Sequence, residues 1–502
     1  MKHFCFLTMK NTTRTNNYGF NFRNTYSRLD KRLFTSLDPI GVKEPSVVLW
    51  NDLLAKELGL NFPDGTEKEL AEIFSGNRLP EGSQPLAQAY AGHQFGHFTM
   101  LGDGRAILLG EQITPAKARL DIQFKGSGQT PYSRRGDGRA TLYSMLREYL
   151  ISEAMHHLRI PTSRSLAVVS TGEDVNRETV NPGAVLTRVM TSHIRVGTFE
   201  YIRYLQPQLI EEFTQYVIDR HFPEIAESEN PALELFDKVM QLQIDLVVNW
   251  MRVGFIHGVM NTDNTGIPGE TFDYGPCAFI NDYHPRKVFS SIDHYGRYAY
   301  GNQPSITQWN LGCFAVTLLP LIDKEEEKAT EVVRERLSDF ERLFSEKYFK
   351  TMCKKLGIEN PEENDGMLIE ELLNWMQQYA ADYTNTFLAI ENEGIFSQGS
   401  DAGIYGQESF TNWYKRWEQR VNRNKGGMKQ AKEIMQQHNP AFIPRNHLVE
   451  QALEAASDHE NFQPFNKLLG ILSRPYDRTD ELSSYQNPPA RGDSGYQTFC
   501  GT

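Results

Sequence analysis

The spacing of apolar and polar positions changes along the chain and predicts two kinds of structure. Between about residues 85 and 195, short runs such as ARLDIQFK and SLAVVS alternate apolar with polar residues, the two-residue period of strands. One segment there has helical spacing instead. From Ala140, ATLYSMLREYLISEAMHHL places Leu142, Met145, Leu146, Tyr149, Leu150 and Leu158 on one stripe. The pattern predicts a β-rich front that carries a single helix.

After about residue 200 the pattern predicts a mainly helical back. Helices are expected over EEFTQYVIDRHF, over PALELFDKVMQLQIDLVVNWMRVGF, and as one charged helix through EVVRERLSDFERLFSEKYFKTM. A segment rich in Gly, Asn, Asp and Pro begins at His257 and is expected to form loops. We therefore predict a disordered leader (1–19), a β-rich lobe (20–198), a helical lobe (199–480) and a loose C-terminal tail that carries Cys500 (481–502).

Charge and composition narrow the class of protein. With 502 residues and a formal charge of −12, the chain is expected to bury a large core and not to bind nucleic acid in general. No uninterrupted apolar run approaches the roughly 20 residues of a membrane span, and the leader lacks a secretion signal, so a cytoplasmic protein is expected. Five cysteines lack CxxC spacing, which predicts neither a disulfide framework nor a zinc site.

A glycine turn and a lysine are the first candidates for a site. In GDGRA, Gly102 and Gly104 would let backbone N–H groups approach a phosphate, although Asp-Gly is equally common in simple hairpins. In LDIQFK, Lys125 lies opposite the apolar residues of its strand, where it would bind a phosphate or remain a solvated charge. Glu148, in the middle of the predicted helix, could pair with Lys125 and orient it.

The loop segment after His257 supplies hard oxygen donors. Asp263, Asn264 and Asp273 lie within eleven residues, and such side chains, together with substrate phosphates, are the ligands that Mg²⁺ prefers. Asp and Asn also favour turns for local reasons. The order of glycine turn, strand lysine, helix glutamate, loop and DYG resembles that of a protein kinase. We therefore predict an α+β, protein-kinase-like two-lobed fold with a Glu-bearing helix in its β-rich N-lobe and a mainly helical C-lobe.

Two departures from a protein kinase point to different chemistry. HGVMNTDN has Gly258 and Val259 where the kinase Arg and catalytic Asp are expected, which leaves Asp263 as the nearby carboxylate able to act as a base. The front half is also rich in arginine, with Arg105, Arg134, Arg135, Arg139, Arg188 and Arg195 near the predicted site. If several guanidinium groups hold the triphosphate tail, the α-phosphorus faces the acceptor. Nucleotidyl transfer would then replace phosphoryl transfer.

Long ordered motifs carry a closer resemblance. The chain resembles the selenoprotein O family, kinase-fold enzymes that transfer AMP from ATP to hydroxyl side chains of other proteins. The resemblance runs from FNFRNTYSRL at Phe20 to the terminal FCGT, through AQAYAGHQFGHF, GDGRA, QFKGSGQTPYSRRGDGRA, LREYLISEAM, HGVMNTDN, DYGP and NPAFIPRNHLVEQAL. Many eukaryotic relatives carry selenocysteine near the C-terminus, where Cys500 stands here.

The resemblance implies a role for each matching residue. Asp263 would be the proton acceptor, Asn264 and Asp273 would hold Mg²⁺, with Mn²⁺ as the alternative, and Glu148 would brace Lys125. The nucleotide would bind flipped relative to kinases. The residues implied to bind ATP are Gly102, Gly104, Arg105, Lys125, Asp137, Gly138, Arg188, Arg195 and Asp273.

Three functions remain open from the sequence. They are a protein adenylyltransferase acting on Ser, Thr or Tyr, a phosphotransferase that uses the γ-phosphate, and an inactive kinase-like scaffold. The missing kinase carboxylate argues against the second, and the complete ligand set against the third. The expected partners are ATP and protein substrates, with no nucleic acid or membrane, and the expected state is a monomer. A thiol on the tail, Cys500, could also reach Cys277, although a buried and inert Cys277 is the alternative.

Overall fold

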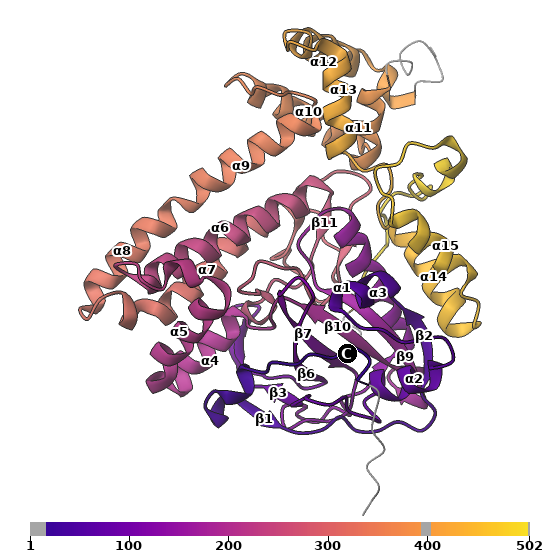
Figure 1. The fold of residues 1–502 in the computed structure, drawn as a ribbon. Coiled ribbons are helices and arrows are strands. Elements are labelled where there is room, and N and C mark those ends of the chain that lie inside the picture. Colours follow the sequence, from indigo (N-terminus) through magenta and orange to yellow (C-terminus); the bar gives the residue numbers. More distant parts are fainter. Residues whose placement is uncertain (1–16, 393–402, 500–502) are drawn as a thin grey trace, which may run out of the picture.

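A computed structural model describes residues 17–392 and 403–499 of the chain (Figure 1). The predicted disordered leader falls mostly on residues 1–16, which lie outside the described residues, as does Cys500. The described chain combines an antiparallel sheet in its first part with many helices in its second. A mixed α and β architecture is therefore present, in the order that the sequence pattern predicts.

The main sheet has eight strands, all paired antiparallel. Its order is β1-β3-β6-β7-β10-β9-β2, and β8 pairs with β10. β4 pairs with β5, and β11 with β12, in two small separate sheets. The strands are β1 Phe34–Ser36, β2 Ser46–Trp50, β3 Leu86–Gln88, β4 Ala91–Gln94, β5 His97–Met100, β6 Ala106–Ile113, β7 Arg119–Lys125, β8 Ala140–Thr141, β9 Arg164–Asn176, β10 Val180–Met190, β11 Phe255–Ile256 and β12 Ala278–Phe279.

Helices cover both faces of the sheet. On β7, Ile122 and Phe124 point into a core shared with α1 (Asp52–Leu58) and α2 (Glu67–Phe74). On the other face, α3 (Leu142–His157) packs against β9 and β10. The prediction of a single helix in the front is therefore wrong for residues 20–85. α1 and α2 span only about two turns each, too short for a helical period to stand out.

The second part is helical. The helices are α4 Val196–Leu205, α5 Ile210–His221, α6 Pro231–Arg252, α7 Gln303–Ile322, α8 Glu326–Ser338, α9 Phe340–Lys355, α10 Asp365–Tyr379, α11 Tyr383–Glu391, α12 Glu408–Val421, α13 Gly427–His438, α14 Asn446–Asp458 and α15 Gln463–Leu472. The charged stretch predicted as one helix forms two, α8 and α9, which are separated at Asp339. The predicted lobe boundary at 198/199 falls inside α4.

One helical stretch among the described residues is long and apolar enough to cross a bilayer by length and composition. It is Tyr300–Ile322, and 56% of its most apolar window is buried inside the protein. Burial of this kind is typical of a core helix as well. This stretch is not an uninterrupted apolar run in the sequence, because polar residues such as Asn310 and Thr317 lie within it. Both are buried.

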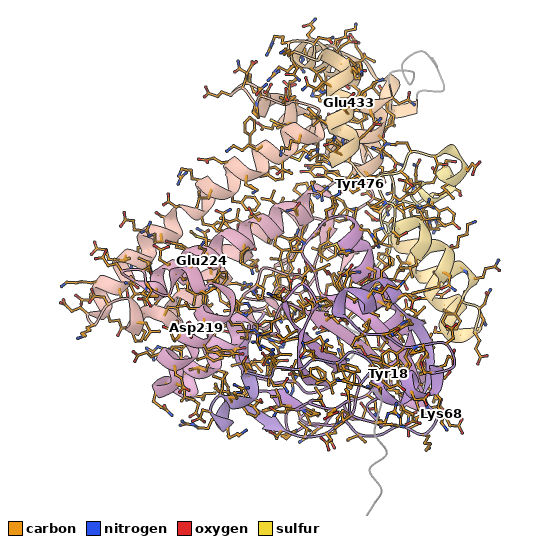
Figure 2. The ribbon with its side chains drawn as sticks, viewed as in Figure 1. Tyr18, Lys68, Asp219, Glu224, Glu433 and Tyr476 are labelled. Carbon is orange, nitrogen blue, oxygen red and sulfur yellow. The ribbon has the colours of Figure 1, made fainter. Side chains whose placement is uncertain are left out.

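The end of the chain is not a loose tail up to Phe499. Asp493 is buried and accepts hydrogen bonds from the backbone and side chain of Asn281. Thr498 donates its hydroxyl to the carbonyl of Pro276 at 2.7 Å. Further back, the hydroxyl of Tyr476 donates to Leu158 O at 3.1 Å and so joins the last quarter of the chain to the end of α3 (Figure 2).

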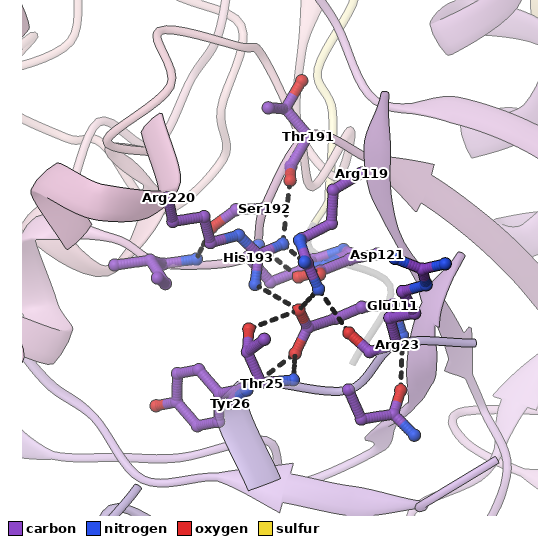
Figure 3. Close-up of polar contacts among 12 residues, drawn as sticks. Arg23, Thr25, Tyr26, Glu111, Arg119, Asp121, Thr191, Ser192, His193 and Arg220 are labelled. Carbon is purple, nitrogen blue, oxygen red and sulfur yellow. Dashed lines mark hydrogen bonds and ion pairs between the residues drawn. The ribbon is translucent and has the colours of Figure 1, made fainter. Parts of the chain in front are cut away.

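Buried charges connect the N-terminal segment to the sheet and to α5 (Figure 3). The carboxylate of Glu111 accepts hydrogen bonds from the backbone N–H groups of Thr25 and Tyr26 at 2.6 and 2.7 Å. Arg220 of α5 lies 3.2 Å from Glu111 Oε2 and donates to Asp121 Oδ1 at 2.6 Å. Burial raises the pKa of Asp121, but the charge and hydrogen bond of Arg220 and the contact with His193 together outweigh this and hold that pKa well below its ordinary value.

Replacing Arg220 with alanine is expected to destabilise the fold strongly. Arg220→Ala leaves the carboxylates of Asp121 and Glu111 buried without this cation, which costs about 3–5 kcal/mol in comparable cases. Urea unfolding followed by circular dichroism measures the change. Arg342→Ala is the matched control, because Arg342 forms its ion pairs on the exposed surface of α9, and no measurable change is expected. Equal stability of the two variants would contradict the assigned role of the buried cluster.

Candidate active site

The glycine turn is not a hairpin. Gly102–Arg105 lies between β5 and β6, but β5 pairs with β4, and β6 pairs with β3 and β7. Gly102 has a φ of +142°, and a Cβ there would lie 2.4 Å from the ring of Tyr132, so no other residue fits. The turn instead lines an open pocket of about 640 Å³. The pocket lining includes Tyr90, Gly102, Gly104, Arg105, Arg134, Arg135, Asp137, Gly138, Arg139, Arg177, Asp263 and Asp273.

A pair of cations and a buried carboxylate form the floor of the site. Lys125 Nζ at the end of β7 donates to Glu148 Oε2 of α3 at 2.6 Å. Arg188, which faces Gln123 of β7 from the neighbouring strand β10, donates its Nε to Glu148 Oε1 at 2.8 Å. Burial raises the pKa of Glu148, but Arg188 and Lys125 outweigh this and keep that pKa below its ordinary value. Glu148 is thus ionised and holds both cations in place.

Asp273 of the DYG segment is the second acceptor for the same cations. Its Oδ1 accepts hydrogen bonds from Lys125 Nζ and, at 3.2 Å, from Arg188 Nη2. Desolvation raises the pKa of Asp273, yet Lys125, Arg188 and Arg105 together hold it well below its ordinary value. Asp273 has a φ of +65°, a left-handed backbone that non-glycine residues rarely adopt. Such strain persists where the surroundings fix it, commonly at functional sites.

Asp263 lies in the same pocket on a 3₁₀ turn, η5 (Thr262–Asn264). Its side chain is buried, and Oδ1 is without a hydrogen-bond partner among the described residues. Burial raises the pKa of Asp263 to about 6, against the opposing charge of Arg195. β4 approaches this side chain closely, because a Cβ on Gly92 would lie 2.6 Å from Asp263 Oδ1. The carboxylate is therefore held in one position and retains a free acceptor atom.

Asn264 lines the smaller part of the site. Its Nδ2 donates to Val259 O at 3.1 Å, which leaves Oδ1 as the acceptor atom of the side chain. Asn264 and Asp273 both line a pocket of about 200 Å³ that adjoins the larger one and shares Arg105, Asp263 and Asp273 with it. The two predicted metal ligands are thus brought to one pocket.

The predicted residues contribute to the pocket in different ways. Arg195 is buried behind the wall, with its guanidinium 4.1 Å from the ring of Tyr90, and donates to the carbonyl of Asp263 at 3.3 Å. Asp137 lies at the exposed rim and forms an ion pair with Arg177 at 2.9 Å. Gly138 has a φ of +69° and packs on the backbone of Gly128. Arg105, Arg134, Arg135, Arg139 and Arg177 line the larger pocket together.

Sequence reasoning missed residues that position the site. Arg147 of α3 donates to the carbonyls of Gly275 and Cys277 at 3.2 and 2.7 Å and so holds the loop after Asp273. Thr262 donates to Glu200 of α4 at 2.5 Å and accepts from the backbone of His93 at 2.7 Å. His93 lies in the family motif AQAYAGHQFGHF, but the spacing of this motif does not indicate a contact with Thr262, 169 residues away.

Cys277 is buried, and burial raises the pKa of its thiol to about 11. An unreactive thiol matches the alternative weighed for this residue. Its proposed partner, Cys500, lies outside the described residues, so the structure carries no test of a link between them.

The fold and the site define a class. A mixed α and β chain that gathers a glycine turn, paired cations and carboxylates in one pocket is typical of enzymes that use nucleotides. Comparison with known proteins identifies the family. The family described as "Protein adenylyltransferase SelO" matches residues 17–473, and the chain belongs to it.

Individual relatives agree with this assignment. The chain is 53% identical to "Protein nucleotidyltransferase YdiU" of Nitrosococcus oceani over 485 residues, which is 96% of this chain and 98% of the relative. It is 54% identical to the protein of the same name from Alcanivorax borkumensis over 486 residues (97% and 99%), and 51% identical to that of Bacillus cytotoxicus over 495 residues (98% and 100%). The chain is accordingly a nucleotidyltransferase.

Gly92→Ala is expected to lower nucleotidyl transfer by about 100-fold, because the added methyl group displaces the carboxylate of Asp263. Initial rates at saturating nucleotide measure the effect. Gly470→Ala is the matched control: it lies in α15 with no heavy atom within 4 Å of the new Cβ, so its rate should equal that of the wild type. A Gly92→Ala protein with the wild-type rate would show that the placement of Asp263 does not limit the reaction.

Proposed function

We propose that the protein transfers AMP from ATP to Ser, Thr or Tyr hydroxyl groups of other proteins and releases pyrophosphate. The observation that carries this proposal is the arrangement of Lys125 and Arg188, held by Glu148, beside a carboxylate with an unpartnered oxygen, Asp263. Lys125 and Arg188 suit a phosphate chain, and the carboxylate of Asp263 suits a hydroxyl nucleophile. The family to which the chain belongs supports adenylyl transfer in particular.

We further propose that the fold is a two-lobed fold of the protein-kinase type. The antiparallel sheet with α3 would be its N-lobe, and the helices from α5 onward its C-lobe. The contact between the strand lysine Lys125 and the helix glutamate Glu148 supports this, as does the position of Asp273 at the same cations. The lobes meet at the pocket that contains Asp263 and Asp273.

The distribution of arginine supports a nucleotide that binds with its phosphates toward the N-lobe. Arg105, Arg134, Arg135 and Arg139 line the larger pocket next to the glycine turn, and Arg188 lies beneath it. Guanidinium groups bind phosphate oxygens bidentately, so this region suits the β- and γ-phosphates. The α-phosphorus then faces Asp263 on the opposite wall, as a flipped nucleotide requires.

The residues present fit a divalent cation with hard ligands. The carboxylate of Asp273 and Oδ1 of Asn264 line one pocket, and Mg²⁺ prefers such oxygens together with substrate phosphates. Mn²⁺ accepts the same donors. When bound, the cation would neutralise charge that develops on the phosphates. Lys125 and Arg188 now share Asp273, so a phosphate oxygen has to replace that carboxylate as their partner.

The acceptor step follows from the position of Asp263. Its carboxylate accepts the proton of the incoming hydroxyl, the hydroxyl oxygen forms a bond to the α-phosphorus, and the bond from that phosphorus to the β-phosphate oxygen breaks. Lys125 and Arg188 stabilise the charge on the departing pyrophosphate. Burial favours this role, since a desolvated carboxylate is a stronger base than an exposed one. A monomeric, cytoplasmic enzyme remains our prediction for its state and location.

Labelled ATP separates the three candidate functions. Incubation with ATP that carries the label at the α-phosphate should make protein covalently radioactive, whereas the γ-labelled nucleotide should not. Covalent label from the γ position would identify a phosphotransferase. If neither nucleotide labels protein in the presence of Mg²⁺ or Mn²⁺, the chain acts as a scaffold and the proposal fails.

Asp263→Asn should separate chemistry from binding. The amide cannot accept the hydroxyl proton, so kcat should fall by about 100- to 10,000-fold while the Kd for ATP changes little. Asp137→Asn is the matched change at the rim of the larger pocket and should raise the KM for ATP with a smaller effect on kcat. A wild-type kcat in Asp263→Asn would remove this residue from the role of base.

A further inference from the structure

Three side chains with metal-binding atoms meet beside the active site. His93 of β4, Glu200 of α4 and Cys313 of α7 each offer one ligand atom, and these atoms all lie within 4.8 Å of one another. His93 Nδ1 lies 2.5 Å from Glu200 Oε1. The residues are separated by more than 100 positions in the chain, so their meeting depends on how β4 packs against α4 and how α4 packs against α7.

The cluster borders open space on one side. His93 and Cys313 line a cavity of about 650 Å³, together with Trp309 and residues of α8. Glu200 lies behind them and is buried. The ring of Trp309 stands edge-on to the imidazole of His93 at 5.3 Å. The protein thus supplies three potential metal ligands, and a fourth ligand could enter from the cavity.

The donor set suits a borderline metal ion. Imidazole, thiolate and carboxylate are the ligands of Zn²⁺, and three protein ligands with one open position are typical of its non-structural sites. Bond lengths of about 2.0–2.3 Å at tetrahedral angles separate ligand atoms by roughly 3.3–3.6 Å. In the structure, one pair of ligand atoms is 2.5 Å apart, closer than that value, and every pair is within 4.8 Å. Small side-chain rotations would therefore complete the site.

We propose that His93, Glu200 and Cys313 form a Zn²⁺ site whose fourth ligand, a water molecule or an exogenous group, lies in the adjoining cavity. This site is distinct from the hard-oxygen pair Asn264 and Asp273, and it does not depend on the proposed reaction. The absence of CxxC spacing gave no sign of it, because the ligands come from three separate elements.

Metal binding exchanges one proton. Burial and the charge of Glu200 raise the pKa of the Cys313 thiol to about 12, so the metal-free protein carries S–H. Zn²⁺ forms the Zn–S bond as the S–H bond breaks, and the proton leaves to solvent. The imidazole proton of the hydrogen bond between His93 and Glu200 moves from Nδ1 to Nε2, and the two side chains bind the metal instead. No oxidant or reductant is needed.

The carboxylate of Glu200 would connect the proposed zinc site to the loop that carries Asp263. Glu200 Oε1 faces His93, while Oε2 accepts the hydroxyl of Thr262, the neighbour of Asp263. The backbone N–H of His93 donates to the same hydroxyl. An ion on Oε1 would connect β4, α4 and α7 directly and stabilise the folded state by mass action.

Cobalt gives a direct optical test. Full-length protein, kept reduced and freed of metal, is titrated with Co²⁺ in the presence of excess Mg²⁺, which occupies hard-oxygen sites. One equivalent should produce the thiolate-to-cobalt charge-transfer band in the near ultraviolet together with the visible bands of tetrahedral Co²⁺, and Zn²⁺ should abolish both. Zn²⁺ should also raise Tm.

Two serine variants decide whether Cys313 is the ligand. Cys313→Ser should lose the charge-transfer band and bind Co²⁺ at least about 100-fold more weakly. Cys353→Ser is the matched control, because Cys353 is also a helical cysteine but is buried outside the cluster, and it should keep the band. His93→Gln should weaken binding as well. A wild-type protein without the band, or a band that survives in Cys313→Ser, overturns the proposal.

Discussion

The site depends on one buried carboxylate that compensates two cations. Glu148 holds Lys125 from β7 with one oxygen and Arg188 from β10 with the other, so α3 and two adjacent strands are joined at a single point. Without Glu148 two positive charges would face each other in a poorly solvated space, which is costly. The helix, the strands and the pocket floor are therefore linked by an electrostatic constraint, and apolar packing on α3 only has to bring them close.

In the proposed reaction, the same constraint lets a phosphate replace Asp273 as the partner of the two cations. Lys125 and Arg188 can each donate more hydrogen bonds than Glu148 accepts, and Asp273 takes up part of this capacity. A phosphate chain offers the same kind of acceptor with more charge. In the proposed reaction, exchange of this carboxylate for a phosphate keeps Lys125 and Arg188 paired throughout. Glu148 stays in place while Asp273, which is 37% exposed, is the replaceable partner.

Local patterns predicted the elements that carry the site, whereas tertiary contacts escaped them. The alternation in LDIQFK assigned Lys125 to the face of the sheet opposite Ile122 and Phe124, and one clear helical stripe located Glu148. The short helices α1 and α2, the break at Asp339 and the docking of Thr498 on Pro276 have no such periodic signal. No local pattern assigned a role to Arg147, because its acceptors, the carbonyls of Gly275 and Cys277, belong to a distant loop.

The loop that carries Asp263 is held at two points. Arg195 holds the carbonyl of Asp263 from within the N-terminal part, and Glu200 holds the hydroxyl of Thr262 from α4. Arg195 is also the N-cap of α4, so both supports belong to one short stretch of chain. A shift of α4 would therefore move the backbone and the neighbour of Asp263 together. Because a displacement near 1 Å is enough to slow a positioned reaction, we expect the packing of α4 against β4 and α7 to control the proposed reaction through the position of Asp263.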